Sequence, residues 1–281
     1  MGKRMEATMA ITFDPGAPPA TVFDKGPSAD LARHFAAVPG YQTATADHRD
    51  LFWWDWGPVF YRGRLNKTAK VVGIASDPGP TERLVGRTLV GDAGQRVQGL
   101  LTKIGLTHSY VLVNAFAYAV HPSRVPDALP LLADPIQLKW RNRFYDLVSG
   151  PQVQAVIAFG GNAQEALAQW TTAPDVPTFN IPHPSDHDTS DLVSKWKAAL
   201  PQIRAAVTPD ADGTNTGPSY GTDFTEADYA AIPAADLPYG LPVWIGNDSW
   251  GRTSQPRHNN CVDRSTTDPN HSMIWRAPAS N

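Results

Sequence analysis

Four short apolar runs divide the middle of the chain at regular intervals. They are rich in β-branched and aromatic residues and lie at 71–75, 110–113, 155–159 and 178–181. Apolar positions at helical spacing follow them, which predicts helices over 95–104, 136–148, 163–170 and 190–200, and an earlier one over 29–37. Strands that alternate with helices form a parallel sheet covered on both faces. The pattern therefore predicts an α/β fold.

Polar, turn-forming residues follow three of these runs. Asp77-Pro78-Gly79-Pro80 comes after the first run, Asn114 after the second and His183-Pro184-Ser185 after the fourth. Open α/β sheets bind ligands at the carboxyl ends of their strands, so these side chains are candidates for a site. Each also has a structural interpretation. Asp-Pro-Gly and asparagine form ordinary turns, and the residues after the last run suit a solvated loop before a helix.

Two further segments allow more than one interpretation. Residues 86–95 read Gly-Arg-Thr-Leu-Val-Gly-Asp-Ala-Gly-Gln, and glycines at three positions predict a loop whose backbone approaches another group closely before a helix begins. Residues 51–61 are dense in Trp, Phe and Tyr. Such density indicates core packing or an anchor between a helix and a loop, and the alternative is a pocket wall or a base-stacking surface.

Composition and charge narrow the class of protein. Hydrophobic residues make up 42% of the 281, and no apolar run approaches the roughly 20 residues of a membrane span. The first residues lead into no signal-peptide core, so we expect a cytoplasmic protein. The single cysteine, Cys261, permits no internal disulfide and no multi-cysteine metal site, which suits a reducing compartment.

A net charge of −3 gives no global signal for nucleic acid, so a DNA-binding surface must be a local patch. Lys139, Arg141 and Arg143 cluster near the start of a predicted helix. They form either a solvated helix face or a patch that contacts phosphates.

The segment 183–188, His-Pro-Ser-Asp-His-Asp, raises the alternative of a metal site, because His and Asp ligate zinc. Pro184 prevents a helix from placing His183 and His187 on one face, and no cysteine is near. We therefore expect no metal and no cofactor.

The order of these motifs resembles the uracil-DNA glycosylase superfamily. A strand ending in Asp-Pro-Gly, the glycine-rich loop 86–95, a strand ending in Asn114 and a strand ending in His183-Pro184-Ser185 follow one another over roughly residues 69–200. The loop most resembles the branch that carries an iron–sulfur cluster. That cluster needs four cysteines, so its absence is expected here.

The resemblance implies a three-layer α/β/α sandwich around a four-stranded parallel sheet. We expect residues 67–207 to form this catalytic core, residues 1–66 to form an N-terminal extension packed on it, and residues 208–281 to form an aromatic-rich C-terminal extension that wraps it. Within the C-terminal extension, residues 209–219 are rich in Pro, Gly, Thr and Asn, which predicts a flexible insertion.

The resemblance also implies roles for named residues. Asp77 would orient a water and stabilise the positive charge on the sugar, and His183 would donate to uracil O2. A second His-Pro-Ser, at 121–123, lies where the family has a variable segment, so placement favours His183. The residues expected to bind uracil are Ser76, Gly79, Leu89 and Asn114. Those expected to contact DNA are Pro80, Ser185, His187, Lys139, Arg141 and Arg143.

Two departures concern the base pocket. Leu89 stands where relatives stack a phenylalanine on uracil, so Leu89 itself or an aromatic such as Phe116 or Trp54 would replace that contact. Gly79 stands where the best-known branch has a tyrosine that blocks the thymine methyl, so exclusion of thymine is less secure.

The resemblance implies a monomeric, monofunctional uracil-DNA glycosylase that acts on DNA containing uracil, single- or double-stranded, and releases free uracil. The alternatives are a mismatch-type glycosylase for other deaminated bases, and a protein that binds uracil-containing or abasic DNA with little turnover.

Overall fold

The computed structural model describes residues 22–40, 51–53, 57–186 and 189–239, and the backbone of two short strands, β6 (Val262–Arg264) and β7 (Met273–Trp275). At its centre is a five-stranded sheet in the order β1-β3-β2-β4-β5. The strands are β1 (Tyr61–Gly63), β2 (Val71–Ala75), β3 (Tyr110–Asn114), β4 (Ala155–Phe159) and β5 (Thr178–Ile181).

Four of these strands, β3, β2, β4 and β5, are parallel neighbours, which confirms the four-stranded parallel sheet. The fifth strand, β1, pairs antiparallel with β3 and adds an edge that we did not predict. Every residue of β2, β3 and β4 is buried, as expected for strands covered on both faces.

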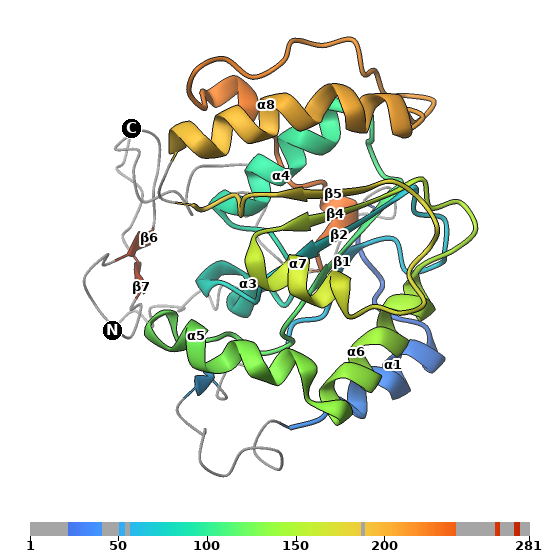
Figure 1. Cartoon of the computed structure of the whole chain (residues 1–281), viewed down its shortest axis with the longest axis vertical. Helices are drawn as coiled ribbons and strands as arrows, with labels where there is room; N and C mark the ends of the chain where they lie inside the picture. Colours follow the sequence, from blue (N-terminus) through green and yellow to red (C-terminus); the bar gives the residue numbers. More distant parts are fainter. Residues whose placement is uncertain are drawn as a thin grey trace, which may run out of the picture.

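Helices cover both faces of the sheet, so the expected three-layer sandwich is present (Figure 1). One face carries α4 (Asp92–Lys103) and α8 (Thr189–Ala206). The other carries α1 (Ala29–Ala36), α6 (Pro135–Val148) and α7 (Gly161–Ala168). The five helices that the sequence predicts are all found, with ends that differ by a few residues.

Alternate side chains of the strands divide the core into two clusters. Val72 and Ile74 of β2 join the cluster under α1, α6 and α7, whereas Val71 and Ala75 join the one under α4 and α8. Burial of each valine or isoleucine side chain stabilises the fold by about 1.5–3 kcal/mol. Because side chains of the strands pack into both clusters, the ends of the strands are held in place, and so are the residues that follow them.

Short elements make the connections around the ends of the strands. The helix α3 (Pro80–Val85) begins directly after the Asp77 loop and stops at Gly86, whose φ of +71° suits glycine. After β3 the chain passes through η3 (Pro122–Arg124), α5 (Val125–Ala128) and η4 (Leu129–Ala133). These short elements were not predicted.

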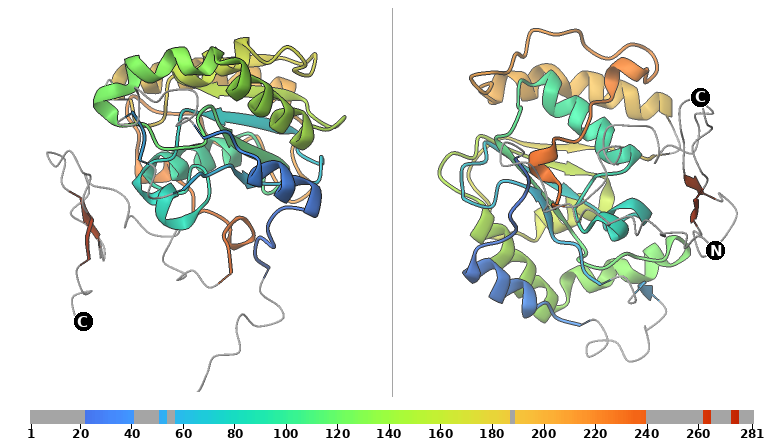
Figure 2. Two further views of the ribbon diagram at one scale, coloured as in Figure 1. Left: turned by 90° about the horizontal axis from the view of Figure 1, so that it is seen from below. Right: turned by 180° about the vertical axis from the view of Figure 1, so that it is seen from behind.

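The segment after α8 returns across the molecule (Figure 2). Buried carboxylates hold it against the core. Asp210 accepts hydrogen bonds from the backbone N–H groups of Thr107, His108 and Ser109 and pairs with Lys70 over 3.0 Å. Further along, η5 (Glu226–Asp228) contacts α4 and η6 (Ala234–Asp236) contacts β1. The segment therefore packs on the core as far as residue 239.

Of the residues named above, Trp54, His187 and Cys261 lie outside the described residues. Within the part of the chain that is described, no helix combines the length and the apolar character that crossing a bilayer requires.

Candidate active site

Asp77 lies two residues beyond the end of β2, and both oxygens of its carboxylate are held. Oδ1 accepts a hydrogen bond from the Ser76 hydroxyl over 2.7 Å, and Oδ2 accepts one from the backbone N–H of Val120 over 2.9 Å. Because one donor precedes Asp77 in the chain and the other comes from the segment after β3, the carboxylate has a defined orientation at the carboxyl edge of the sheet.

The environment of Asp77 raises its pKa to about 6. Burial is the main cause, and the nearby carboxylate of Glu82 adds to it; the hydrogen bonds from Ser76 and Val120 and the charge of Arg83 act in the opposite direction. Asp77 is therefore ionised at neutral pH, at a cost in free energy, in a setting with little water to screen its charge.

His183 follows β5 and sits against the turn after β4. Gly160 has a φ of +82°, and a Cβ there would lie 2.8 Å from the Cβ of His183, so glycine is needed for this close approach. Burial lowers the pKa of His183 to about 4, against a smaller opposing effect of Asp186. The imidazole is therefore neutral at pH 7.

The contacts of His183 also define its tautomer. The backbone N–H of Ser185 donates to Nδ1 over 3.3 Å, and the Ser185 hydroxyl lies 2.8 Å from the same atom. A backbone N–H can only donate, so Nδ1 is the unprotonated nitrogen and the neutral ring carries its proton on Nε2. His183 thus presents a neutral N–H donor.

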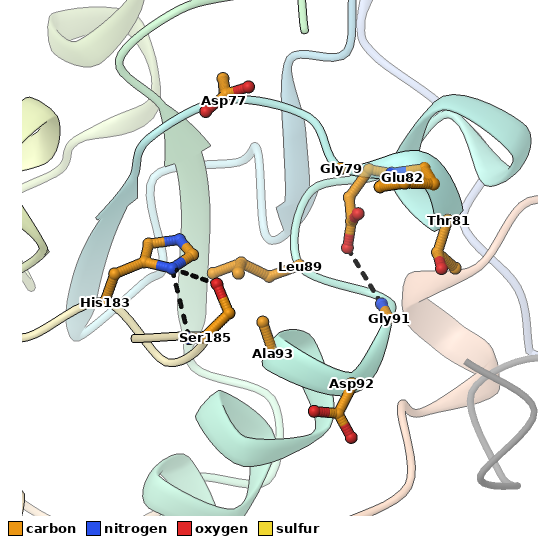
Figure 3. A pocket seen from close by; sticks show the side chains of 11 residues that line it. Asp77, Gly79, Thr81, Glu82, Leu89, Gly91, Asp92, Ala93, His183 and Ser185 are labelled. Atoms are coloured by element: carbon orange, nitrogen blue, oxygen red, sulfur yellow. Dashed lines mark hydrogen bonds between the residues drawn. The ribbon is translucent and has the colours of Figure 1, made fainter. Parts of the chain in front are cut away.

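A cavity of about 330 Å³ joins these groups (Figure 3). In that view Asp77, His183 and Ser185 lie along one side and Glu82 and Gly91 along the other, with Leu89 between them. The complete lining is Asp77, Gly79, Pro80, Thr81, Glu82, Leu89, Gly91, Asp92, Ala93, His183 and Ser185. His121 is not among them; its ring packs instead against Trp53, with centroids 3.9 Å apart.

A second cavity, of about 370 Å³, shares three lining residues with the first. Asp77, His183 and Ser185 line it too, and Ser76, Gly160 and Asn162 contribute to its wall. We name the first the Leu89 cavity and the second the Asn162 cavity. Asp77 and His183 therefore border two spaces, each large enough for a base or a sugar.

The buried side chain of Glu82 holds the glycine-rich loop in its conformation. Its Oε1 accepts hydrogen bonds from the backbone N–H groups of Val90 (2.8 Å) and Gly91 (2.9 Å). Leu89 has a φ of +53°, unusual for a branched residue, and a Cβ at Gly94 would overlap the Leu89 carbonyl. The close approach predicted for this loop is thus to its own backbone, and it holds Leu89 in the cavity.

The structure brings together most of the residues expected to bind uracil. Gly79 and Leu89 line the Leu89 cavity with the two catalytic candidates, and Ser76 lines the Asn162 cavity. Pro80 and Ser185, both expected to contact DNA, also line the Leu89 cavity. Asn114 lines neither. It is buried at the end of β3, where its Nδ2 donates to the Val59 carbonyl over 3.1 Å.

The basic cluster lies apart from both cavities. Lys139 and Arg143 are exposed on α6, which packs against α1 and contributes no residue to either cavity. Arg141 is 3% exposed, and its guanidinium donates to the Leu132 carbonyl and to Gln169. We therefore leave Arg141 out of any DNA-binding surface.

Sequence reasoning missed two polar residues of the site, Glu82 and Asn162. Asn162 lies in the first turn of α7, and its Nδ2 donates to the Ser76 hydroxyl over 2.8 Å. The signal for Asn162 was present, because Gly160-Gly161-Asn162 directly follows an apolar run, as the other site residues do. Glu82 lies in a short helix that the sequence did not predict.

Among the described residues, His108, Asp210 and Asp212 are the group of possible metal ligands whose ligand atoms lie within 4.8 Å of one another. His108 and Asp210 lie at the amino-terminal end of β3, away from both cavities, and Asp210 already binds Lys70 and three backbone N–H groups. This group therefore stabilises a turn and is not part of the candidate active site.

Comparison with known proteins assigns the family. The model of the uracil DNA glycosylase superfamily matches residues 62–199, which include most of β1, the complete parallel sheet and both cavities. A comparison with curated proteins found no match. The family match supports a DNA-repair role of the glycosylase type, with DNA as the partner. Residues 62–199 are therefore a domain of the uracil-DNA glycosylase superfamily.

Proposed function

We propose that the chain is a monofunctional uracil-DNA glycosylase, which receives a uracil flipped out of DNA and hydrolyses its N-glycosidic bond. The observation that carries this proposal is the pairing of an ionised Asp77 with a neutral His183 on one cavity. A base inside a duplex is out of reach, so an enzyme that cleaves this bond needs an enclosed pocket for an extruded nucleotide.

Asp77 acts on the sugar. Cleavage of the glycosidic bond gives the sugar oxocarbenium character, and a nearby carboxylate stabilises that charge most where water is excluded. The hydrogen bonds from Ser76 and Val120 hold Asp77 in place, so little reorganisation is needed when the charge develops. The same carboxylate orients the attacking water.

His183 acts on the leaving group. As the bond breaks, negative charge gathers on uracil O2, and a neutral Nε2–H donates a hydrogen bond to that oxygen. A donor with a pKa of about 4 in its protonated form stays neutral throughout, so its role is stabilisation of the anion rather than delivery of a proton. The products are free uracil and an abasic site.

Recognition of uracil by Asn114 remains part of the proposal. The Val59 carbonyl can only accept, so it fixes the amide with Nδ2 toward Val59 and Oδ1 as the outward acceptor. An acceptor suits the N3–H of uracil and is repelled by the unprotonated N3 of cytosine. Since Asn114 does not line the Leu89 cavity, this contact requires the site to rearrange when the base enters.

For the DNA itself, we propose that Ser185 and Pro80 contact the backbone at the rim of the cavity. We propose the same role for His187, which lies outside the described residues. Lys139 and Arg143 are exposed and could bind phosphates only some way along the strand from the flipped base.

A broader choice of base is the second candidate, and two features of the cavity favour it. Gly79 has no side chain to exclude a substituent, and the carboxylate of Glu82 lies against it, since a Cβ on Gly79 would be 2.6 Å from Glu82 Oε2. The two hydrogen bonds from Val90 and Gly91 both go to Oε1, so Oε2 is the oxygen that can accept an N–H or O–H from a modified base.

One gel tests the proposal. Purified protein is incubated with oligonucleotides carrying a single uracil, hypoxanthine, thymine or 5-hydroxymethyluracil, single- or double-stranded, and alkali then cleaves at abasic sites. We expect cleavage at uracil and none at thymine paired with adenine. Strand cleavage without alkali would contradict a monofunctional enzyme, and a gel shift without any cleavage would show a binding protein instead.

A further inference from the structure

A chain of two hydrogen bonds leads from α7 to the carboxylate of Asp77. The amide Nδ2 of Asn162 donates to the Ser76 hydroxyl over 2.8 Å, and that hydroxyl donates to Asp77 Oδ1 over 2.7 Å. Asn162 follows β4 and Asp77 follows β2, and these strands are parallel neighbours in the sheet. The chain of bonds therefore joins the ends of two adjacent strands.

The direction of these bonds follows from their chemistry. A serine hydroxyl has one proton, and a carboxylate is its strongest available acceptor. With that proton given to Asp77, Ser76 can meet Asn162 only as an acceptor, so Asn162 must present its NH₂ group. If the amide were reversed, its oxygen would compete with Asp77 for the same proton.

We propose that Asn162 is a positioning residue for Asp77. Asn162 keeps the proton of the Ser76 hydroxyl directed at the Asp77 carboxylate and so fixes the orientation of that carboxylate for catalysis. The proposal rests on the proposed function in that Asp77 is taken to act on the sugar. Asn162 itself touches Ser76, not the carboxylate, so its effect reaches the reaction through another side chain.

Loss of Asn162 has a definite consequence. A serine hydroxyl has three staggered rotamers and a freely rotating proton. Both Ser76 and Asn162 border the Asn162 cavity, so without the amide the hydroxyl can turn toward that space. Asp77 Oδ1 then loses its donor while Oδ2 keeps the backbone N–H of Val120. The charged groups that face Asp77 are otherwise unchanged: Glu82 and Arg83 of α3.

The direct test measures the pKa of Asp77 without any substrate. The carboxyl carbon of Asp77 is followed by NMR over pH, with its signal identified by its loss in Asp77→Asn. Loss of a donor to a carboxylate destabilises its ionised form, so Ser76→Ala is expected to raise this pKa by about one to two units. Asn162→Ala acts through one more bond, and we expect a rise of about half a unit.

Three further variants make the result specific. Gln164→Ala removes a side-chain amide from the same helix, and it should leave the pKa of Asp77 unchanged because Gln164 contacts the Ile181 carbonyl instead. Ser76→Thr keeps the hydroxyl and should keep the wild-type value. The double variant Ser76→Ala/Asn162→Ala should match Ser76→Ala alone, since Asn162 has no other route to Asp77. Asn162→Leu serves if Asn162→Ala does not fold.

The rate of uracil excision supplies the second readout. In Asn162→Ala, the fall of the single-turnover rate at low pH should begin at a higher pH than in the wild type, by the same shift as the pKa of Asp77. The rate at pH 8.5 should fall only a few-fold. An Asp77 pKa in Asn162→Ala that equals the wild-type value overturns the inference, and a lost rate with that unchanged pKa would mark Asn162 as a direct DNA contact. If the pKa of Asp77 rises in Asn162→Ala but the wild type excises no uracil, the positioning role of Asn162 is supported and the proposed function is contradicted.

Discussion

At the scale of single residues, Asp77 and His183 are held in their less usual pKa ranges by the same cause. Burial penalises the charged form of each, so the pKa of the carboxyl rises to about 6 and the pKa of the imidazole falls to about 4. The site therefore places a costly negative charge and a neutral donor on the wall of one cavity, the combination that suits a charge-separated transition state.

These opposite shifts predict how stability depends on pH. Asp77 binds its proton more readily in the folded state, so its contribution to stability is full below pH 4 and is lost as pH rises through about 6. His183 binds its proton less readily in the folded state, so its contribution is full above pH 6.5 and is lost as pH falls through about 4. Each effect reaches about 3 kcal/mol at most, and in the wild type the two largely cancel.

Single variants should reveal each effect. Asp77→Asn removes the carboxylate penalty, so it should be more stable than the wild type at pH 7.5 and lose that advantage as pH falls to 4. His183→Ala should gain stability over the same fall in pH. Urea unfolding at pH 7.5 and 4.5 measures both; parallel pH dependence in the two variants would show that burial does not set these pKa values.

At the scale of elements, the sequence predicted strands and strand ends better than short connections. β2, β4 and β5 lie where the apolar runs place them, because turn residues end each run sharply. β1 has three residues and exists through its pairing with β3, and α3 has six residues directly after a Pro-Gly turn. Such pieces are stabilised by tertiary contacts that local sequence does not contain.

The same limit explains the candidate site. Residues that follow strands could be predicted, and most meet at the two cavities. The basic cluster is different, because its helical spacing alone divides it: positions 139 and 143 share a face of a helix, while 141 lies about 160° away from both. Accordingly Lys139 and Arg143 are exposed and Arg141 is buried. The bonds made by Glu82 and Asn162 depend on contacts across the fold.

The glycine-rich loop provides a prediction at this scale. Gly94→Ala places a methyl group on the Leu89 carbonyl, so the loop must move, and we expect loss of uracil excision together with a fall in stability of several kcal/mol, on the order of 2–4. Gly86→Ala is the matched control. Gly86 has a positive φ, but a methyl group there would meet no atom within 4 Å, so about 1 kcal/mol is expected with excision retained. Equal effects of the two substitutions would contradict the role of close packing.

At the scale of the whole molecule, a carboxylate from the segment after α8 binds side chains of the edge strand β1 and its neighbour β3. Asp236 is 1% exposed; it pairs with the buried Arg62 over 3.1 Å and accepts from the Tyr110 hydroxyl over 2.6 Å. Arg62 also donates to Gln98 of α4. One ionic cluster thus joins β1, β3, α4 and the returning chain.

Asp236→Asn should destabilise the protein by about 3–5 kcal/mol, because it leaves the buried Arg62 without its countercharge. Asp30→Asn is the control, since the ion pair of Asp30 with Arg33 is largely exposed and contributes little. Thermal unfolding measures both, and excision by folded Asp236→Asn at low temperature should be near that of the wild type. Equal melting temperatures for the two variants would show that the returning segment does not hold the sheet edge.

The most direct test of the account is a set of single-turnover excision rates at pH 7.5, on one uracil-containing oligonucleotide, for the wild type, Asp77→Asn, His183→Ala and the double variant. We expect Asp77→Asn to slow excision by orders of magnitude with nearly unchanged DNA affinity, because the carboxylate acts mainly in the transition state. His183→Ala should cost about 10²–10³ in rate. The double variant should be less impaired than the product of the two losses, since both groups stabilise one transition state. A wild-type rate in Asp77→Asn would contradict the assignment of Asp77 and the proposed function built on it.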